Sequence, residues 1–215
     1  FAPKKKIDMH IAIAGNIGVG KTTLTGMLAK HYGWEANYEV VDDNPYLNDF
    51  YQDMKAWAFN VQISYLHSRL QRIMSIRNSG KDVIQDRTIY EDAYIFAPNL
   101  HGMKLMATRD FETYFSLFQQ VEQLLQAPDL LIYLKASIPT LVKRIQCKGR
   151  EYENAIRIDY LESLNRRYET WVKSYDLGKI LVIDTDSINF IDNPEDFSKI
   201  VNKIDAELFG LFKNE

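Results

Sequence analysis

The sequence contains one cysteine, Cys147, in 215 residues. A single cysteine cannot form an internal disulfide, which fits a reducing compartment, and we expect a cytoplasmic protein. The sequence lacks any apolar run approaching the roughly 20 residues that a helix needs to cross a bilayer. Nothing near the N-terminus has the form of a signal peptide. We therefore expect no membrane association.

An excess of positive charge is also lacking. Lysine and arginine number 26 against 29 aspartates and glutamates, a formal net charge of -3. Because nucleic acids are held by concentrated positive charge, this balance argues against a nucleic-acid partner. The one compact basic run, at residues 4–6, belongs to residues 1–8, which we expect to be a flexible arm or a remnant left by processing. Residues 9–215 are expected to form one domain.

Short apolar runs alternate with helical patterns along the chain. We expect strands at 10–14, 38–41, 83–85, 130–134 and 180–183, and helices at 55–78, 90–97, 110–125, 139–147, 159–174 and 194–212. The helix at 90–97 is expected to end before Pro98. Alternating strands and helices form a parallel sheet covered on both faces. The sequence thus predicts an α/β fold with five parallel strands.

Residues 15–22 have the pattern G-x-x-x-x-G-K-T between the first predicted strand and a helical pattern. Glycines let several backbone N–H groups converge on a polyphosphate, and the start of the helix adds positive potential. Lys21 can then reach the outer phosphates, and the Thr22 hydroxyl can ligate Mg²⁺. We expect this phosphate loop and the turn after it to bind nucleotide through Gly15, Asn16, Ile17, Gly18, Val19, Gly20, Lys21, Thr22 and Thr23.

A phosphate loop alone does not distinguish a kinase from a GTPase-like switch. Residues 202–205 have the N-K-x-D form with which GTPases read guanine, but they fall within an amphipathic helical pattern, whereas guanine recognition needs a loop. The sequence also lacks the D-x-x-G motif that senses the γ-phosphate in such switches. A non-catalytic regulatory module that binds nucleotide stays an alternative.

Charged side chains favour phosphoryl transfer instead. Asp86 and Arg87 follow the third predicted strand, at the sheet edge where α/β proteins bind ligands. Arg144, Lys148 and Arg150 follow one another at spacings of four and two. They can form a lid, at about residues 144–155, that closes over the phosphates and excludes water. From spacing alone, a solvated basic helix end is an alternative for these three cations.

Several motifs occur together in a fixed order: G-N-I-G at 15–18, Glu39, Trp57 with Gln62, D-R-T at 86–88, I-Y-L at 132–134, and residues 144–153 followed by Y-L-E. As a set they resemble the deoxynucleoside kinase family, from about residue 10 to residue 171. Residues 42–46 are similar to the bacterial deoxyadenosine and deoxyguanosine kinases of that family. The resemblance implies a phosphate-loop kinase that uses ATP and Mg²⁺.

The resemblance also implies catalytic roles. Glu39, at the carboxyl end of the second strand, would accept the proton of the sugar 5'-hydroxyl, and Arg87 would lie between Glu39 and the transferring phosphoryl group. Asp86 would orient Mg²⁺ together with Thr22. The donor phosphates would contact Lys21, Arg144, Lys148 and Arg150. The donor adenine would lie against the loop at 184–189, with Asp186 as the candidate contact.

For the acceptor, the resemblance implies that Tyr51 and Glu153 bind the 3'-hydroxyl. Gln62 suits a base edge, because its amide both donates and accepts. Arg69 lies two helical turns further on, and with Asp92 it can satisfy acceptors and an exocyclic amino group. Phe96 would stack on the base, and Trp57 would also contact the acceptor. The Arg69–Asp92 pairing favours a purine deoxynucleoside as substrate.

Other enzymes remain possible from the sequence. Cytosine also offers an amino group to Asp92, so a deoxycytidine or broad-specificity deoxynucleoside kinase is an alternative. A nucleoside monophosphate kinase of the thymidylate kinase type is another, although it needs more cations for its acceptor phosphate. The helices at 55–78 and 110–125 carry more apolar surface than one sheet face needs. Family members pair these helices, which implies a homodimer.

Overall fold

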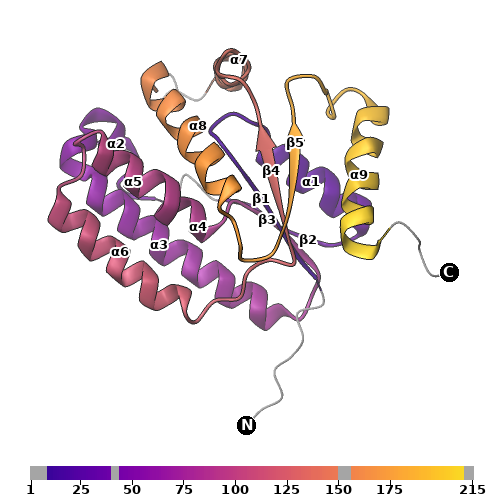
Figure 1. Cartoon of the computed structure of the whole chain (residues 1–215), viewed down its shortest axis with the longest axis horizontal. Helices are drawn as coiled ribbons and strands as arrows, with labels where there is room; N and C mark the ends of the chain where they lie inside the picture. Colours follow the sequence, from indigo (N-terminus) through magenta and orange to yellow (C-terminus); the bar gives the residue numbers. More distant parts are fainter. Residues whose placement is uncertain (1–8, 40–43, 150–155, 211–215) are drawn as a thin grey trace, which may run out of the picture.

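Figure 1 shows the computed structural model, which describes residues 9–39, 44–149 and 156–210. Its centre is a five-stranded sheet in the order β2-β3-β1-β4-β5. Every neighbouring pair is parallel. The strands are β1 (His10–Gly15), β2 (Glu35–Asn37), β3 (Val83–Asp86), β4 (Leu130–Lys135) and β5 (Lys179–Asp184). The predicted α/β fold with five parallel strands is confirmed.

Helices cover both faces of this sheet (Figure 1). They are α1 (Lys21–Tyr32), α2 (Leu47–Gln52), α3 (Met54–Ser79), α4 (Ile89–Glu91), α5 (Ala97–Gly102), α6 (Thr108–Glu122), α7 (Ile138–Lys148), α8 (Ile158–Lys173) and α9 (Pro194–Phe209). A π-helical turn, Asp92–Phe96, joins α4 to α5. Among the described helices, none is long and apolar enough to cross a membrane.

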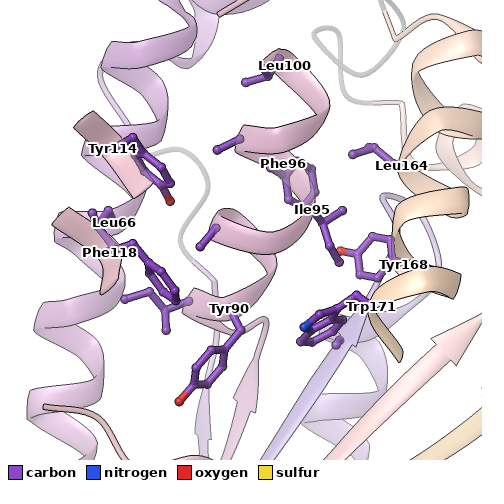
Figure 2. Packing of buried hydrophobic residues seen from close by; sticks show 14 of the residues in the cluster. Leu66, Tyr90, Ile95, Phe96, Leu100, Tyr114, Phe118, Leu164, Tyr168 and Trp171 are labelled. Carbon is purple, nitrogen blue, oxygen red and sulfur yellow. The ribbon is translucent and has the colours of Figure 1, made fainter. Parts of the chain in front are cut away.

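Two hydrophobic cores lie on the two sides of the sheet. One joins α1 and α9 to the strands and contains Leu24, Leu28 and Ile204. The other, shown in Figure 2, packs the α4–α5 region between α3, α6 and α8. Because both faces are buried, the central strand β1 is buried along its whole length, as its apolar sequence predicted.

The register of the sheet brings the charged motifs together. In β1 and β3, Ile13 pairs with Asp86, and in β1 and β4, Gly15 pairs with Leu134. The phosphate loop and the Asp86–Arg87 turn therefore leave the sheet side by side, at the edge where the parallel strands end. This is the edge at which ligands of open α/β sheets bind.

The second predicted strand was wrong in position. The structure has β2 at Glu35–Asn37, whereas the prediction was 38–41, of which 40–41 lie outside the described residues. β2 is an edge strand that pairs only with β3 within the described sheet, and its side chains are exposed or half-buried. An edge strand does not need an apolar run, so the apolar pattern pointed to the residues that follow it.

The predicted helix end before Pro98 was also wrong. Helical structure runs from Ile89 through Gly102, with Pro98 in the first turn of α5. The preceding turn is wider, because Ala97 N–H donates to the carbonyl of Asp92, five residues back. Pro98 thus occupies a position like that at a helix start, where its missing N–H costs little.

Candidate active site

The phosphate loop, residues 15–22, has no room for a side chain at two of its glycines. Gly15 has a φ of 148°, and a Cβ there would lie 2.7 Å from the carbonyl oxygen of Leu134. Gly18 has a φ of 81°, and its Cβ would lie 2.7 Å from Ile145. A side chain is therefore excluded at these two positions by close packing as well as by backbone conformation.

Lys21 begins α1 and is buried below the loop. Its Nζ donates to the carbonyl oxygens of Gly15 at 2.8 Å and Asn16 at 3.1 Å. Burial, together with the charge of Arg87, lowers the pKa of Lys21 to about 8, although Asp86 acts in the opposite direction. The ammonium group is held inside the loop and is still mostly protonated at neutral pH.

Thr22 and Asp86 form a pair that fits a magnesium ion. The Thr22 hydroxyl donates to Asp86 Oδ2 at 2.6 Å, and Asp86 Oδ1 is buried without a hydrogen-bond partner in the described structure. Burial raises the pKa of Asp86, and Lys21 opposes this shift. Within the described residues no cluster of three metal-binding side chains occurs. Mg²⁺ suits such a site, since it commonly takes one or two protein oxygens and completes its shell with phosphate and water.

Glu39 lies between two arginines. Its Oε1 accepts from Arg69 Nη2 at 2.6 Å, and its Oε2 lies 3.1 Å from Arg87 Nε. The second contact is an ion pair without hydrogen-bond geometry. Burial would raise the pKa of Glu39, but Arg87 and then Arg69 outweigh it and lower the pKa to about 2. The side chain, 10% exposed, is therefore a carboxylate throughout the physiological pH range.

The backbone of Arg87 is strained. Its φ of 66° lies in the left-handed region, which non-glycine residues seldom adopt. Three contacts hold it there: its N–H donates to the Ile13 carbonyl at 2.9 Å, its own carbonyl accepts from Gln85 Nε2 at 2.9 Å, and its guanidinium lies 4.5 Å from the ring centre of Phe96. Such strain is typical of functional sites that the surrounding structure fixes.

Asp92 and Arg69 pair in the interior. Arg69 Nε donates to Asp92 Oδ2, and Arg69, only 2% exposed, also lies over the ring of Tyr65. Burial raises the pKa of Asp92 to about 6, against the effect of Arg69 and Arg87. Asp92 and Phe96 are the two ends of the π-helical turn, so this irregular turn carries two of the predicted base-binding residues.

A single cleft brings most of the predicted residues together. Its lining contains Ile17, Gly18, Gly20, Lys21, Thr22, Glu39, Tyr51, Gln62, Arg87, Asp92, Phe96 and Lys148. The buried Oε1 of Gln62 has no hydrogen-bond partner among the described residues. Sequence reasoning missed five further lining residues: Leu47, Phe50, Val61, Tyr65 and Tyr160. Val61 and Tyr65 could have been found, because they flank Gln62 on the same helix.

The sequence profile of the deoxynucleoside kinase family matches residues 11–209. This chain belongs to the deoxynucleoside kinase family. The kinase is 37% identical over 205 residues to the deoxyadenosine/deoxycytidine kinase of Bacillus subtilis, an alignment that covers 94% of this chain and 93% of the relative. It is 36% identical to the deoxyguanosine kinase of Lactobacillus johnsonii, with 95% of each chain covered.

Solved structures agree with this assignment. The deoxyadenosine kinase of M. mycoides with bound dATP matches with a TM-score of 0.80 and 32% identity, over 92% of this kinase and all of that chain. The same enzyme with the products dCMP and a flexible dCDP matches with a TM-score of 0.83 at 32% identity, over the same shares of the two chains. The sequence-based resemblance is confirmed.

Some predicted site residues of the kinase lie away from the cleft lining. Trp57 stacks on Tyr46, with ring centres 5.8 Å apart. Arg144 donates to the carbonyl oxygens of Val19 and Thr185 at 3.0 and 2.8 Å. Asp186 accepts from the backbone N–H and hydroxyl of Ser137, which directly precedes α7.

The remaining predicted residues fall into two groups. Asn16 Nδ2 donates to Asn165 Oδ1 at 2.7 Å, which ties the phosphate loop to α8, and Thr23 lies exposed on α1. Arg150 and Glu153 lie outside the described residues, as does the second half of the predicted lid, residues 150–155. Their placement in the site stays a prediction.

The titration of Lys21 predicts how ATP affinity depends on pH. With a pKa of about 8, the cation is present below that pH and is lost as the pH rises through it. Calorimetric titration of the kinase with Mg-ATP should give a steady affinity up to about pH 8, then a loss that approaches tenfold per pH unit. Lys21→Arg, which stays charged, should lack this dependence. An affinity of the unaltered kinase that is constant to about pH 9.5 would contradict the role of Lys21.

Proposed function

We propose that this kinase transfers the γ-phosphoryl group of ATP, with Mg²⁺, to the 5'-hydroxyl of a purine deoxynucleoside. The observation that carries the proposal is the Glu39–Arg87 pair, which lines the same cleft as Lys21 and Thr22 of the phosphate loop. A carboxylate can hold the acceptor hydroxyl there, while the adjacent guanidinium faces the transferring group.

Positioning and charge would supply most of the catalysis. Phosphoryl transfer passes through a loose transition state that spreads negative charge over the equatorial oxygens. Lys21, Arg87 and Lys148 line the cleft and can stabilise that charge. Thr22 and Asp86 would hold Mg²⁺, which neutralises phosphate charge when bound. Arg144 and Arg150 are proposed to complete the donor site as the lid closes.

The acceptor end of the cleft suits an uncharged deoxynucleoside. Gln62 presents a buried oxygen without a partner among the described residues, Asp92 is a buried acceptor, and Phe96 lines the same cleft with an aromatic ring. These groups can receive the exocyclic amino group of adenine and stack on the base. Tyr51, with Glu153, is proposed to bind the 3'-hydroxyl. The names of the relatives, deoxyadenosine and deoxyguanosine kinases, support the purine preference.

Deoxycytidine is the second candidate acceptor. The Bacillus subtilis relative is named for deoxyadenosine and deoxycytidine, and the M. mycoides enzyme was solved with dCMP. Asp92 can accept from the amino group of cytosine as well as from that of adenine.

The acceptor assay decides among these readings. The kinase is incubated with Mg-ATP and each of the four deoxynucleosides, and separately with each of their monophosphates. Among the deoxynucleosides, deoxyadenosine or deoxyguanosine should give its 5'-monophosphate with the highest kcat/KM. A higher value for deoxycytidine would select the second candidate. Product only from monophosphates would indicate a thymidylate-kinase-type enzyme, and product from no acceptor would indicate a regulatory module.

Replacement of Glu39 tests the catalytic assignment. Glu39→Gln keeps the size of the side chain but removes the carboxylate, and we expect kcat to fall at least about 100-fold. Affinity for ATP should be unchanged within about twofold, because the ion pairs that Glu39 makes in the described structure are to Arg69 and Arg87 and not to the phosphate loop. The control is Glu35→Gln, which alters an exposed glutamate of β2 that pairs with Lys81 at the surface. Turnover that survives in Glu39→Gln would remove Glu39 from the mechanism.

We also propose that the kinase is a homodimer that pairs through α3 and α6. These helices pack side by side at one end of the molecule (Figure 1). Met74 on α3 and Leu117 on α6 expose 55% and 43% of their surface, and Leu124 just beyond α6 exposes 72%. Burial of such side chains drives association. Light scattering after size exclusion should give twice the mass of one chain, and a single-chain mass would refute the dimer.

A further inference from the structure

Glu91 is a completely buried carboxylate that lies outside the cleft lining. Its Oε2 accepts from the N–H of Thr88 at 2.7 Å and from the Thr88 hydroxyl at 3.1 Å. Its Oε1 accepts from the N–H of Gly15 at 3.2 Å and from the hydroxyl of Tyr168 at 2.7 Å. Four donors on two oxygens satisfy a buried charge well.

Helix capping explains only half of these contacts. Thr88 and Glu91 form a capping box at the start of α4, and that motif uses Oε2 alone. Glutamine serves in a capping box as well as glutamate does. The contacts of Oε1, to the phosphate loop and to α8, require a separate explanation.

The position of Glu91 suggests what Oε1 does. The N–H of Arg87 donates to the Ile13 carbonyl and so continues the pairing of β3 with β1 by one residue. Just beyond this bond, the N–H of Gly15 and the N–H of Thr88 are bridged by the two oxygens of Glu91. The carboxylate thus continues the link between the two segments after the strands have ended.

Tyr168 fixes this bridge from the other side. It projects from α8 toward the central helical segment, as Figure 2 shows, and is 0% exposed. Its hydroxyl donates to the same Oε1 that accepts from Gly15. Because α8 also contacts the loop through Asn165 and Asn16, the phosphate loop is tied to α8 at two neighbouring residues.

We propose that Glu91 is a positioning residue for phosphoryl transfer, which sets the phosphate loop relative to the turn that carries Asp86 and Arg87. The inference rests on the proposed function. Both backbone partners, Gly15 N–H and Thr88 N–H, can only donate, so both oxygens must accept. Glutamine cannot replace glutamate here, because its NH₂ group would face one of these two N–H groups.

Glu91→Gln is the direct test. We expect kcat to fall about ten- to a hundredfold and KM for ATP to rise severalfold, as loss of one hydrogen bond to a charged group displaces the loop. KM for the deoxynucleoside should change less than about twofold, since Glu91 does not line the acceptor cleft. A variant that melts at a lower temperature but keeps kcat and KM for ATP, measured while folded, would reduce Glu91 to a structural role and overturn the proposal.

Tyr168→Phe keeps the test decisive if Glu91→Gln does not fold. It removes one hydroxyl and should lower kcat several-fold with the same KM pattern. The matched control is Tyr32→Phe, which removes a tyrosine donor to Asp205 between α1 and α9, away from the loop. Equal losses of kcat in Tyr168→Phe and Tyr32→Phe would overturn the proposal. If both Glu91→Gln and Tyr168→Phe fold, the double variant should lose no more kcat than Glu91→Gln alone, and additive losses would also overturn it.

Binding separates failure of this inference from failure of the proposed function. If the unaltered kinase phosphorylates no deoxynucleoside, the proposed function fails, but calorimetric titration with Mg-ATP still tests Glu91. Weaker ATP binding by Glu91→Gln than by Tyr32→Phe would then support the positioning of the loop. Equal binding by the two variants would overturn it.

Discussion

The buried group of Glu39, Arg69, Arg87 and Asp92 constrains the rest of the site. Two carboxylates and two guanidiniums balance one another, and each comes from a different element: the segment after β2, α3, the turn after β3 and the π-helical turn. A buried charge without a partner costs several kcal/mol. The fold therefore holds these four elements together at the sheet edge, and the same contacts that compensate the charges define the cleft.

Backbone geometry fixes this group beside the phosphate loop. Arg87 adopts a left-handed conformation because the Ile13 carbonyl, Gln85 and Phe96 all hold it. Gly15, two residues beyond Ile13, approaches Leu134 too closely for any side chain. The strained backbone of Arg87 after β3 and the close packing of Gly15 at the end of β1 leave these two segments little freedom to move relative to each other. In the proposed reaction, this rigidity is what keeps charged donors aimed at the transferring group without reorganisation.

The sequence predicted those parts of the molecule that local patterns encode. The phosphate loop, the Asp86–Arg87 pair and the apolar strands were predicted because each is a contiguous signal. The spacing of two helical turns relates Arg69 to Gln62 on α3, and the structure pairs Arg69 with Asp92, while its contact with the base stays a prediction. The exact place of β2 was missed, since an edge strand carries no apolar run. The contacts of Glu91 and the lining residue Tyr160 were missed because their partners lie far away in the sequence. Trp57 stacks on Tyr46, and its predicted contact with the acceptor stays a prediction.

The two arginines beside Glu39 also limit which mechanism the site can perform. A pKa of about 2 makes Glu39 a weak base, poorly suited to removing a proton before the hydroxyl attacks. In a loose transition state the bond to the nucleophile forms late, so the hydroxyl keeps its proton until the phosphoryl group has largely left the donor. A weak base is then sufficient. The positive charge of Arg87 and Arg69, which lowers the pKa of Glu39, matters more for the reaction than the basicity that Glu39 loses. The low pKa of Glu39 is thus consistent with phosphoryl transfer through positioning and charge, in which Arg87 pairs with the carboxylate and is proposed to face the transferring group as well.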